Sequence, residues 1–400
     1  MTPLFLRRFT ATSCIGRGLQ PTLESLRGQR SGLRHCAFET VTLDTHIGEV
    51  PGVDEIRLPA TLRRFDCRNN RLARLGIEAD GFIDEVAACA GRWGRQRVGL
   101  FLGTSTSGIL ETEVAYRRRD PATGALPADF DYAGSHNSYS LAGFLRALLG
   151  LEGPSAVVSS ACSSSAKVFA SARRMIAAGV IDAAVVGGVD SLCLTTLYGF
   201  HSLQLVSARP CRPFDVERDG ISIGEAAAFA LIERPPGSLD ENAILLLGAG
   251  ESSDAYHMSS PHPEGRGARA AMLQALAGAG LAPEHIDYIN LHGTGTPSND
   301  SAEGKAVAAV FADREQPVPA SSTKGATGHT LGAAGALEAV ICALALQHRL
   351  LPGSANTQRV EPSLGFEYLR ANSARPIARA LSNSFGFGGS NCALILGRAG

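Results

Sequence analysis

The stretch Ser155-Ala156-Val157-Val158-Ser159-Ser160-Ala161-Cys162-Ser163-Ser164-Ser165-Ala166 decides how the rest of this chain is interpreted. Its first four residues are typical of a short buried strand. Apolar residues then recur at the spacing of an amphipathic helix, at Val168, Ala172, Met175 and Ile176. Because unpaired amides at a helix start favour a thiolate, we expect Cys162 to be a nucleophile whose turn also offers an amide to an oxyanion. A lone free cysteine is more often a small core residue, so residues elsewhere must decide.

Length, charge and cysteine content together indicate a soluble protein. The 400 residues are enough for one large or two ordinary domains. Lys and Arg number 37 against 38 Asp and Glu, which indicates no nucleic-acid or membrane partner. Nine cysteines are scattered singly, without a pair or cluster at metal spacing, so we expect a cytoplasmic protein without a metal site. The longest apolar tract, Ala333 to Leu346, is interrupted by Glu338, and we expect neither a membrane span nor a secretory signal.

Short apolar runs alternate with helical patterns, which predicts α/β structure with a parallel sheet. The break Arg234-Pro235-Pro236-Gly237-Ser238 predicts two similar halves, residues 1–236 and 237–400. The expected strands are 97–102, 155–158, 182–188, 226–232, 243–247, 288–291, 318–320, 380–384 and 392–396, the last two forming a hairpin. The expected helices include 140–149, within an excursion over the core, 267–277, ended by Gly278, and a long one through 334–344.

The second half holds three further turns with reactive or positioning residues. In Leu291-His292-Gly293-Thr294-Gly295-Thr296-Pro297, a neutral imidazole at a strand end can donate to a developing oxyanion. Lys324 stands five residues before His329, across a glycine turn, where its charge can hold the imidazole neutral. In the glycine-rich turn 383–391, Phe385 and Phe387 could form an apolar gate. Each turn taken alone also fits an ordinary loop.

Two acids follow the His292 turn. Asp300 and Glu303 have the spacing of an N-cap and its reciprocal third residue, which predicts that a helix begins at Asp300.

Together these turns resemble the elongating, thiolase-fold β-ketoacyl-acyl-carrier-protein synthases, which use a Cys-His-His set. The resemblance covers roughly residues 95–398. Its motifs stand in the family's order: Ala161-Cys162-Ser163, Pro213-Phe214-Asp215 with Arg218-Asp219-Gly220, His292 to Pro297, Lys324 with Gly328-His329, and Gly386-Phe387-Gly388-Gly389. The resemblance implies a thiolase-like fold, with two similar α/β halves forming a layered α-β-α-β-α core.

The resemblance also implies a decarboxylative Claisen condensation in two stages. An acyl chain passes from the phosphopantetheine of acyl carrier protein to Cys162, and the amides of Cys162 and Phe387 form the oxyanion hole. Malonyl-carrier protein then loses carbon dioxide, with its enolate held by His292 and His329. The carbanion attacks the acyl-cysteine and lengthens a fatty acyl or polyene chain by two carbons. Lys324 is expected to orient His329.

Further roles follow from the same resemblance. Thr294, Thr296, Phe385 and Phe387 are expected to bind substrate, and Glu338, Asp300 and Glu303 to support the site. No metal or redox cofactor is expected, because phosphopantetheine arrives as part of the substrate. The protein is expected to be a homodimer, or a heterodimer with a related subunit, with its interface near the strand after the nucleophile helix.

Several features leave the pathway open between housekeeping fatty-acid synthesis and a specialised lipid or polyene pathway. Phe9 to Gly16 is a weak version of the family's opening strand, Gly224-Glu225-Ala226-Ala227 has alanines where glycines are usual, and Ser163 to Ser165 is rich in hydroxyls.

Three rival assignments remain. A thiolase would need a second cysteine in the loop Gly386 to Gly389, which has none. An initiating synthase would have asparagine at His329. A non-catalytic chain-length-determining subunit typically lacks the nucleophile.

Overall fold

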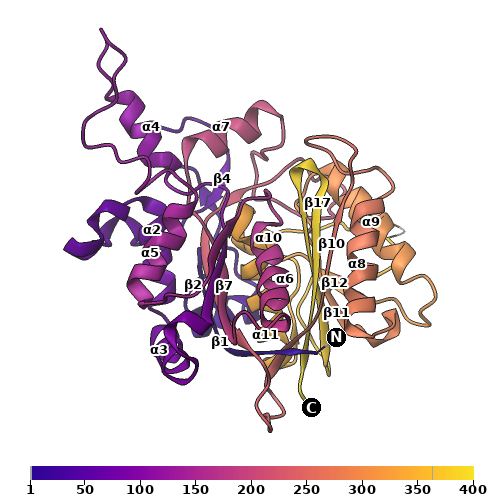
Figure 1. Cartoon of the computed structure of the whole chain (residues 1–400). Helices are drawn as coiled ribbons and strands as arrows, with labels where there is room; N and C mark the ends of the chain where they lie inside the picture. The colour runs from indigo at the N-terminus through magenta and orange to yellow at the C-terminus, as the bar shows by residue number, and fades with distance from the viewer. Residues whose placement is uncertain (1, 363) are drawn as a thin grey trace.

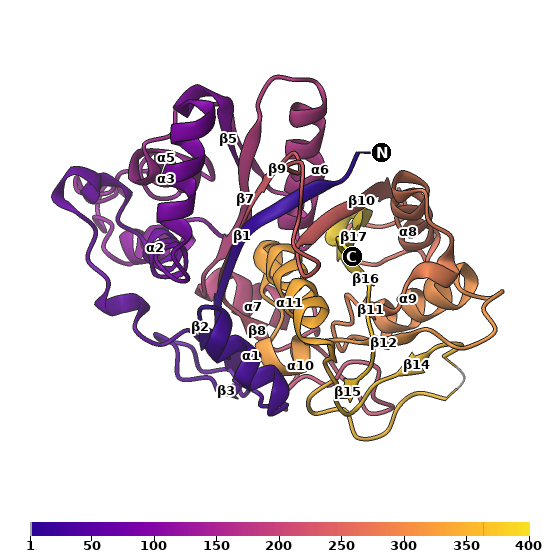
Figure 2. The same cartoon turned by 90° about the horizontal axis from the view of Figure 1, so that it is seen from below.

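The computed structural model describes residues 2–362 and 364–400, and its strands and helices are stacked in five layers (Figures 1 and 2). One outer layer holds α2 (Arg68–Ile77), α3 (Phe82–Trp93) and α5 (Tyr139–Leu149), and the other holds α8 (Arg266–Ala279) and α9 (Pro297–Val310). Two sets of strands lie between them and enclose a pair of central helices. The layered α-β-α-β-α arrangement expected from the sequence is therefore confirmed.

The strands of the two halves share one topology. The first half contributes β1 (Leu4–Ser13), β5 (Val98–Gly103), β6 (Ser155–Val158), β7 (Ala183–Asp190) and β9 (Ala226–Glu233), in the spatial order β6-β5-β7-β9-β1. The second half contributes β10 (Ile244–Ser253), β11 (Tyr288–Asn290), β12 (Pro319–Ser321), β16 (Arg379–Gly386) and β17 (Ser390–Arg398), in the order β12-β11-β16-β17-β10. When the five strands of each half are numbered along the chain, their spatial order is 3-2-4-5-1 in both halves.

Parallel and antiparallel pairings also coincide in the two halves. Strands 2, 3 and 4 of each half pair in parallel, and strands 5 and 1 join antiparallel. A short antiparallel pairing of Leu4–Leu6 with Ile244–Leu246 connects the halves into one sheet. The repeat is therefore a repeat of topology, without a visible repeat of residues.

The two central helices carry the buried interior and bring the ends of the strands together. They are α6 (Ser164–Ala177) and α11 (Ala334–His348), and each packs on strands of both halves (Figure 2). The segment Leu331–His348 is long and apolar enough to cross a membrane, but 89% of it is buried inside the protein, as expected of a core helix. The turns that lead from strands into helices lie at the same edge of the sheet in both halves. Turns from the two halves therefore meet at that edge.

The remaining regular elements are short or peripheral. The other helices are α1 (Leu19–Arg27), α4 (Ile109–Arg117), α7 (Leu194–Ser202) and α10 (Lys324–Thr327), with short 3-10 segments at Val53–Glu55, Ala60–Phe65, Arg95–Arg97, Pro283–His285, Leu331–Ala333 and Phe387–Gly389. The other strands are β2 (Gly16–Arg17), β3 (Arg34–His35), β4 (His46–Gly48), β8 (Ile223–Gly224), β13 (Leu350–Leu351), β14 (Glu367–Tyr368) and β15 (Ser373–Ala374).

The opening strand, β1, extends over Leu4–Ser13, with β9 on one side and β10 on the other. One expected helix end needs correction. Gly278 lies inside α8, which ends at Gly280 with φ 67°, a left-handed conformation that glycine adopts without strain. The strand after the nucleophile helix, β7, is buried between β5 and β9, and its expected place near a dimer interface stays a prediction. The edge of the sheet is β6, whose four residues are all half-buried.

Candidate active site

The nucleophile turn connects β6 to α6, as the sequence predicts. Ala161 has φ 53°, a left-handed backbone that is strained for a residue with a side chain. Its carbonyl accepts hydrogen bonds from the Ser164 amide at 3.1 Å and the Ser164 hydroxyl at 2.6 Å, which hold the turn. Cys162 follows, two residues before the first helical residue, and is 5% exposed. The turn therefore presents one thiol into the interior at the helix start.

His329 reaches Cys162 from the other half of the chain. Its Nε2 lies 3.0 Å from the Cys162 Sγ. The His329 backbone is held on both sides: its amide donates to the Ser222 carbonyl at 2.7 Å, and its carbonyl accepts from the Gly224 amide at 2.9 Å. The Nδ1 atom of His329 is buried and has no hydrogen-bond partner among the described residues. His329 is thus placed to exchange a proton with the thiol.

His292 follows β11 and completes the group, with its ring centroid 5.3 Å from that of His329. Two buried acids hold its loop. Glu303 accepts the amides of His292 at 2.8 Å and Gly293 at 2.7 Å, while Asp300 accepts the Thr294 amide at 3.0 Å. These acids do not form the predicted N-cap pair, because α9 begins earlier.

The helix α9 begins at Pro297, with Thr296 in the N-cap position. Proline suits the first helical turn, where its missing amide hydrogen would have no partner. Asp300 and Glu303 are therefore left free to bind the preceding loop, and their supporting position agrees with the sequence-based expectation.

Lys324 contacts His292, not His329 as expected from sequence proximity. Its Nζ lies 3.4 Å from His292 Nδ1 and forms an ion pair with Glu338. Because an ammonium has only donors, Nδ1 of His292 accepts, and the His292 proton resides on Nε2. Lys324 also acts on His329, whose pKa its charge lowers. The lysine therefore sets the tautomer of one imidazole and the charge of both.

Burial governs the charge state of the three reactive side chains. It raises the pKa of the Cys162 thiol to about 12, against the opposing effects of Lys324 and the Phe387 backbone amide. The expected helix-start stabilisation of a thiolate is thus outweighed by desolvation. Burial, then Lys324, holds the pKa values of His292 and His329 well below the ordinary histidine range. The resting site therefore pairs a neutral thiol with a neutral base.

The spacing of these side chains also bears on metal binding. The ligand atoms of Cys162, His292 and His329 all lie within 4.8 Å of one another, so by distance alone they could surround an ion. The Lys324 ammonium beside His292 opposes a second cation there.

A cavity opens onto the reactive atoms. Its walls include the sequence-predicted residues Cys162, His292, Thr294, Thr296, His329, Phe385 and Phe387. Lys324, Glu338, Asp300 and Glu303 are not among the lining residues and lie behind the wall. The structure thus separates residues that face a substrate from residues that hold them.

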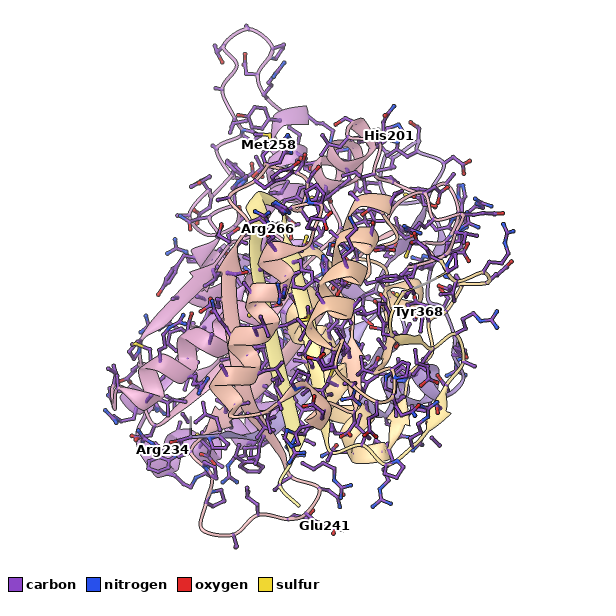
Figure 3. All side chains as sticks on the ribbon, turned by 90° about the vertical axis from the view of Figure 1, so that its right-hand side faces the viewer. His201, Arg234, Glu241, Met258, Arg266 and Tyr368 are labelled. Atoms are coloured by element: carbon purple, nitrogen blue, oxygen red, sulfur yellow. The ribbon has the colours of Figure 1, made fainter. Side chains whose placement is uncertain are left out.

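The gate loop belongs to the hairpin of β16 and β17. Gly388 and Gly389 have φ 78° and 75°, and the Gly388 amide donates to the Met258 carbonyl at 2.8 Å. Met258 lies at one end of the molecule, far from Arg234 and Glu241 at the opposite end (Figure 3). The sequence did not predict that Phe200, from α7, faces Phe387 across the mouth, with ring centroids 5.5 Å apart. Nothing in the local sequence of α7 signals this partnership.

Comparison with known proteins agrees with this geometry. Residues 77–236 match the family described as beta-ketoacyl synthase, N-terminal domain, and residues 244–358 match beta-ketoacyl synthase, C-terminal domain. The chain is 35% identical over 314 residues to 3-oxoacyl-[acyl-carrier-protein] synthase 2 of Coxiella burnetii, covering 76% of this chain and 75% of that protein. It is 31% identical over 403 residues to the synthase of the same name from Vibrio cholerae, covering 96% of each.

A solved structure is also similar over the whole chain. A chain in the complex of the ketosynthase ApeO with its chain length factor ApeC, from Xenorhabdus doucetiae, is 36% identical, with a TM-score of 0.86 over all of this chain and 98% of that one. The two matched segments cover more than half of the sequence, and the Cys162, His292 and His329 side chains meet in one cavity. The chain therefore belongs to the β-ketoacyl synthase family of acyltransferases.

Proposed function

We propose that this protein is a β-ketoacyl-[acyl-carrier-protein] synthase that adds two carbons to an acyl group held on Cys162. The observation that carries the proposal is the 3.0 Å contact between Cys162 Sγ and His329 Nε2 at the wall of one cavity. A chain-length-determining subunit needs no such contact, so the reactive pair disfavours that alternative. A thiolase is disfavoured by the absence of cysteine from the gate loop.

In the first stage, Cys162 attacks the thioester of an acyl carrier protein. The thiol proton passes to Nε2 of His329 as the sulfur–carbon bond forms. The amides of Cys162 and Phe387 receive the oxyanion, a role supported by the Phe387 amide already facing the thiol. The carbon–sulfur bond to phosphopantetheine then breaks, and the departing thiolate takes the proton from His329.

In the second stage, malonyl-carrier protein occupies the same cavity, bordered by Thr294 and Thr296. Its carboxylate leaves as carbon dioxide, and the electron pair enters the thioester as an enolate. Nε2–H of His292 donates to the enolate oxygen, since Lys324 occupies Nδ1. The enolate carbon attacks the acyl-cysteine and the carbon–sulfur bond to Cys162 breaks. Cys162 leaves as a thiolate that takes up one proton from solvent, and the product is a β-ketoacyl-carrier protein. Thioester chemistry supplies the activation, and phosphopantetheine enters as substrate.

The direct test combines the purified protein with malonyl-carrier protein and a labelled acyl-carrier protein. We expect a mass increase equal to the acyl group on Cys162, followed by two-carbon elongation. Cys162→Ala should abolish both, whereas Cys89→Ala, a buried cysteine in α3, should abolish neither. Unchanged acylation and elongation in Cys162→Ala would refute the assignment. Acyl-carriers of different lengths would distinguish fatty-acid from polyene substrates.

We propose a dimer formed through the edge strand β6. Its half-buried residues and unpaired side contrast with the buried β5 and β7, and edge strands pair readily. The partner is a second copy or a related subunit. Sedimentation of the protein alone, and mixed with a chain length factor, separates these cases, and a fully active monomer would refute both.

We also propose that the two domain halves divide between residues 236 and 237. We further propose that the protein resides in a reducing compartment. The shared strand order of the two halves supports the division, and the extended link near Arg234 and Glu241 lies at the end of the molecule opposite Met258 (Figure 3). Nine free cysteines support the compartment, since disulfides form in oxidising surroundings. Separately expressed halves that refold together into an active enzyme would support the division, and failure of both to fold would count against it.

A further inference from the structure

A buried carboxylate at the end of β7 joins backbone segments from the two halves. Asp190 is fully buried. Its Oδ1 accepts hydrogen bonds from the Thr104 hydroxyl at 2.8 Å, the Ser105 amide at 2.7 Å, and the Thr106 amide and hydroxyl at 2.8 Å each. Its Oδ2 accepts the Gly332 amide at 2.5 Å. One side chain thus binds the hydroxyl-rich turn after β5 and the turn after His329.

Each of the two turns that Asp190 binds is linked to a reactive residue by a single hydrogen bond or a short length of chain. The Ser105 hydroxyl donates to the Ala161 carbonyl at 3.3 Å, and Ala161 precedes Cys162. Gly332 stands three residues after His329, and the intervening Leu331 has φ 51°. Left-handed backbone at a non-glycine residue costs about 1–3 kcal/mol and persists where surrounding contacts impose it. Strained residues therefore stand on both sides of the reactive pair, and Asp190 bonds Gly332 directly and reaches Ala161 through Ser105.

The surroundings leave Asp190 little freedom to move. A Cβ added to Gly332 would lie 2.7 Å from both Asp190 Oδ2 and Ser105 Oγ. Behind this contact, the Ser165 hydroxyl accepts the Ala336 amide at 2.9 Å and so connects the first turns of α6 and α11. A carboxylate in such a packed position transmits its geometry to both turns.

We propose that Asp190 is a positioning residue that sets the distance between Cys162 and His329. It does not line the cavity, so it acts through the Ser105–Ala161 and Gly332 backbone contacts and not on substrate. The inference rests on the proposed function, because the Cys162–His329 contact matters for acyl transfer. It also accounts for the hydroxyl-rich turn Gly103 to Gly108, which the proposed reaction does not use.

The test is Asp190→Asn, which keeps the shape but replaces one acceptor oxygen with a donor. In either orientation of the new side-chain amide, its NH₂ group faces backbone N–H donors of one of the two turns. The hydrogen bonds to that turn are therefore lost. Displacing reacting groups by about 1 Å costs about a hundredfold in rate, so we expect kcat for acyl transfer to fall by at least about tenfold. KM for the acyl-carrier should be unchanged. Asp182→Asn is the matched control, since Asp182 precedes the other end of β7 and bonds Arg97 at 2.7 Å.

A second measurement separates positioning from a merely structural role and needs no carrier protein. Iodoacetamide labelling of Cys162, followed by intact mass from pH 6 to 10, reports how well His329 accepts the thiol proton. Asp190→Asn should label more slowly than wild type at neutral pH and depend more steeply on pH, whereas Asp182→Asn should label like wild type. If Asp190→Asn only lowers the urea midpoint and labels like wild type, the inference is wrong.

A milder variant covers the case in which Asp190→Asn does not fold. Ser105→Ala removes only the hydroxyl bond to the Ala161 carbonyl, and we expect a two- to fivefold loss of kcat, about 0.4–1 kcal/mol, in a folded protein. Unaltered kcat and labelling in Ser105→Ala would also overturn the inference. Failure of wild type to condense malonyl- and acyl-carriers would instead refute the proposed function, while the labelling comparison would still decide the role of Asp190.

Discussion

The clearest prediction concerns His329→Ala and its effect on acylation of Cys162. Because burial raises the pKa of the Cys162 thiol to about 12, thiolate is scarce at pH 7.5, and direct attack without a base is slow. General-base catalysis contributes about 10²- to 10⁴-fold. We therefore expect His329→Ala to lose that factor at pH 7.5, since no other nitrogen base is hydrogen-bonded to Sγ among the described residues.

The pH dependence makes this prediction sharper. In wild type the low pKa of His329 keeps the base neutral above pH 6.5, so the acylation rate should be nearly flat from pH 7 to 9. In His329→Ala the rate should follow the thiolate fraction and rise about tenfold for each pH unit. Rapid-quench intact-mass measurement of acyl-Cys162 provides the rates.

The control for this experiment is His292→Ala. His292 is not hydrogen-bonded to Sγ, so acylation should survive while decarboxylation of malonyl-carrier falls. Acylation of His329→Ala within a few fold of wild type at pH 7.5, or a flat pH profile for that variant, would refute the assigned proton transfer.

Three other substitutions test the supporting residues. Lys324→Met removes the donor to His292 Nδ1, and we expect the rate of carbon dioxide release to fall about 10- to 100-fold and the rate of Cys162 acylation to fall less. Equal losses of both rates would contradict the assigned tautomer of His292. Glu303→Gln turns an acceptor toward the amides of the His292 loop into a donor and should lower the free energy of unfolding by about 1–3 kcal/mol in urea titrations, an effect that an unchanged midpoint would disprove. Phe387→Ala keeps the backbone amide but removes the ring facing Phe200, so acyl-chain selectivity measured with carriers of different length should broaden while kcat for short chains is retained; a collapse of kcat for all lengths would show that the ring does more than gate.

Much of the chemistry could be predicted from local sequence because reactive residues at strand ends have recognisable surroundings. Cys162 follows a strand and precedes a helix, and His292 follows another strand, so their positions depend mainly on nearby residues. Helix boundaries were less predictable. Asp300 and Glu303 have the spacing of a cap, yet Pro297 starts the helix and both acids bind the loop before it.

Contacts between distant segments could not be predicted. Lys324 is close in sequence to His329 but hydrogen-bonded to His292, because α10 turns its side chain into the interior beside β11. Phe200 meets Phe387, and Asp190 meets Gly332, across 187 and 142 residues of chain. No local pattern records such pairs, since their partners are chosen when the sheets and central helices pack.

For the opening stretch, neighbouring residues are enough to predict a cysteine on a strand-to-helix turn, because strand, turn and helix each depend on local propensity. The partners that make it a β-ketoacyl synthase nucleophile were expected only from the resemblance of the whole set of turns to that family. The tertiary structure decided the charge of the thiol, raising its pKa where the helix start alone predicted a thiolate. It also decided which base receives the proton. Both outcomes depend on burial and on distances between the two halves, which exist only after the layers have packed.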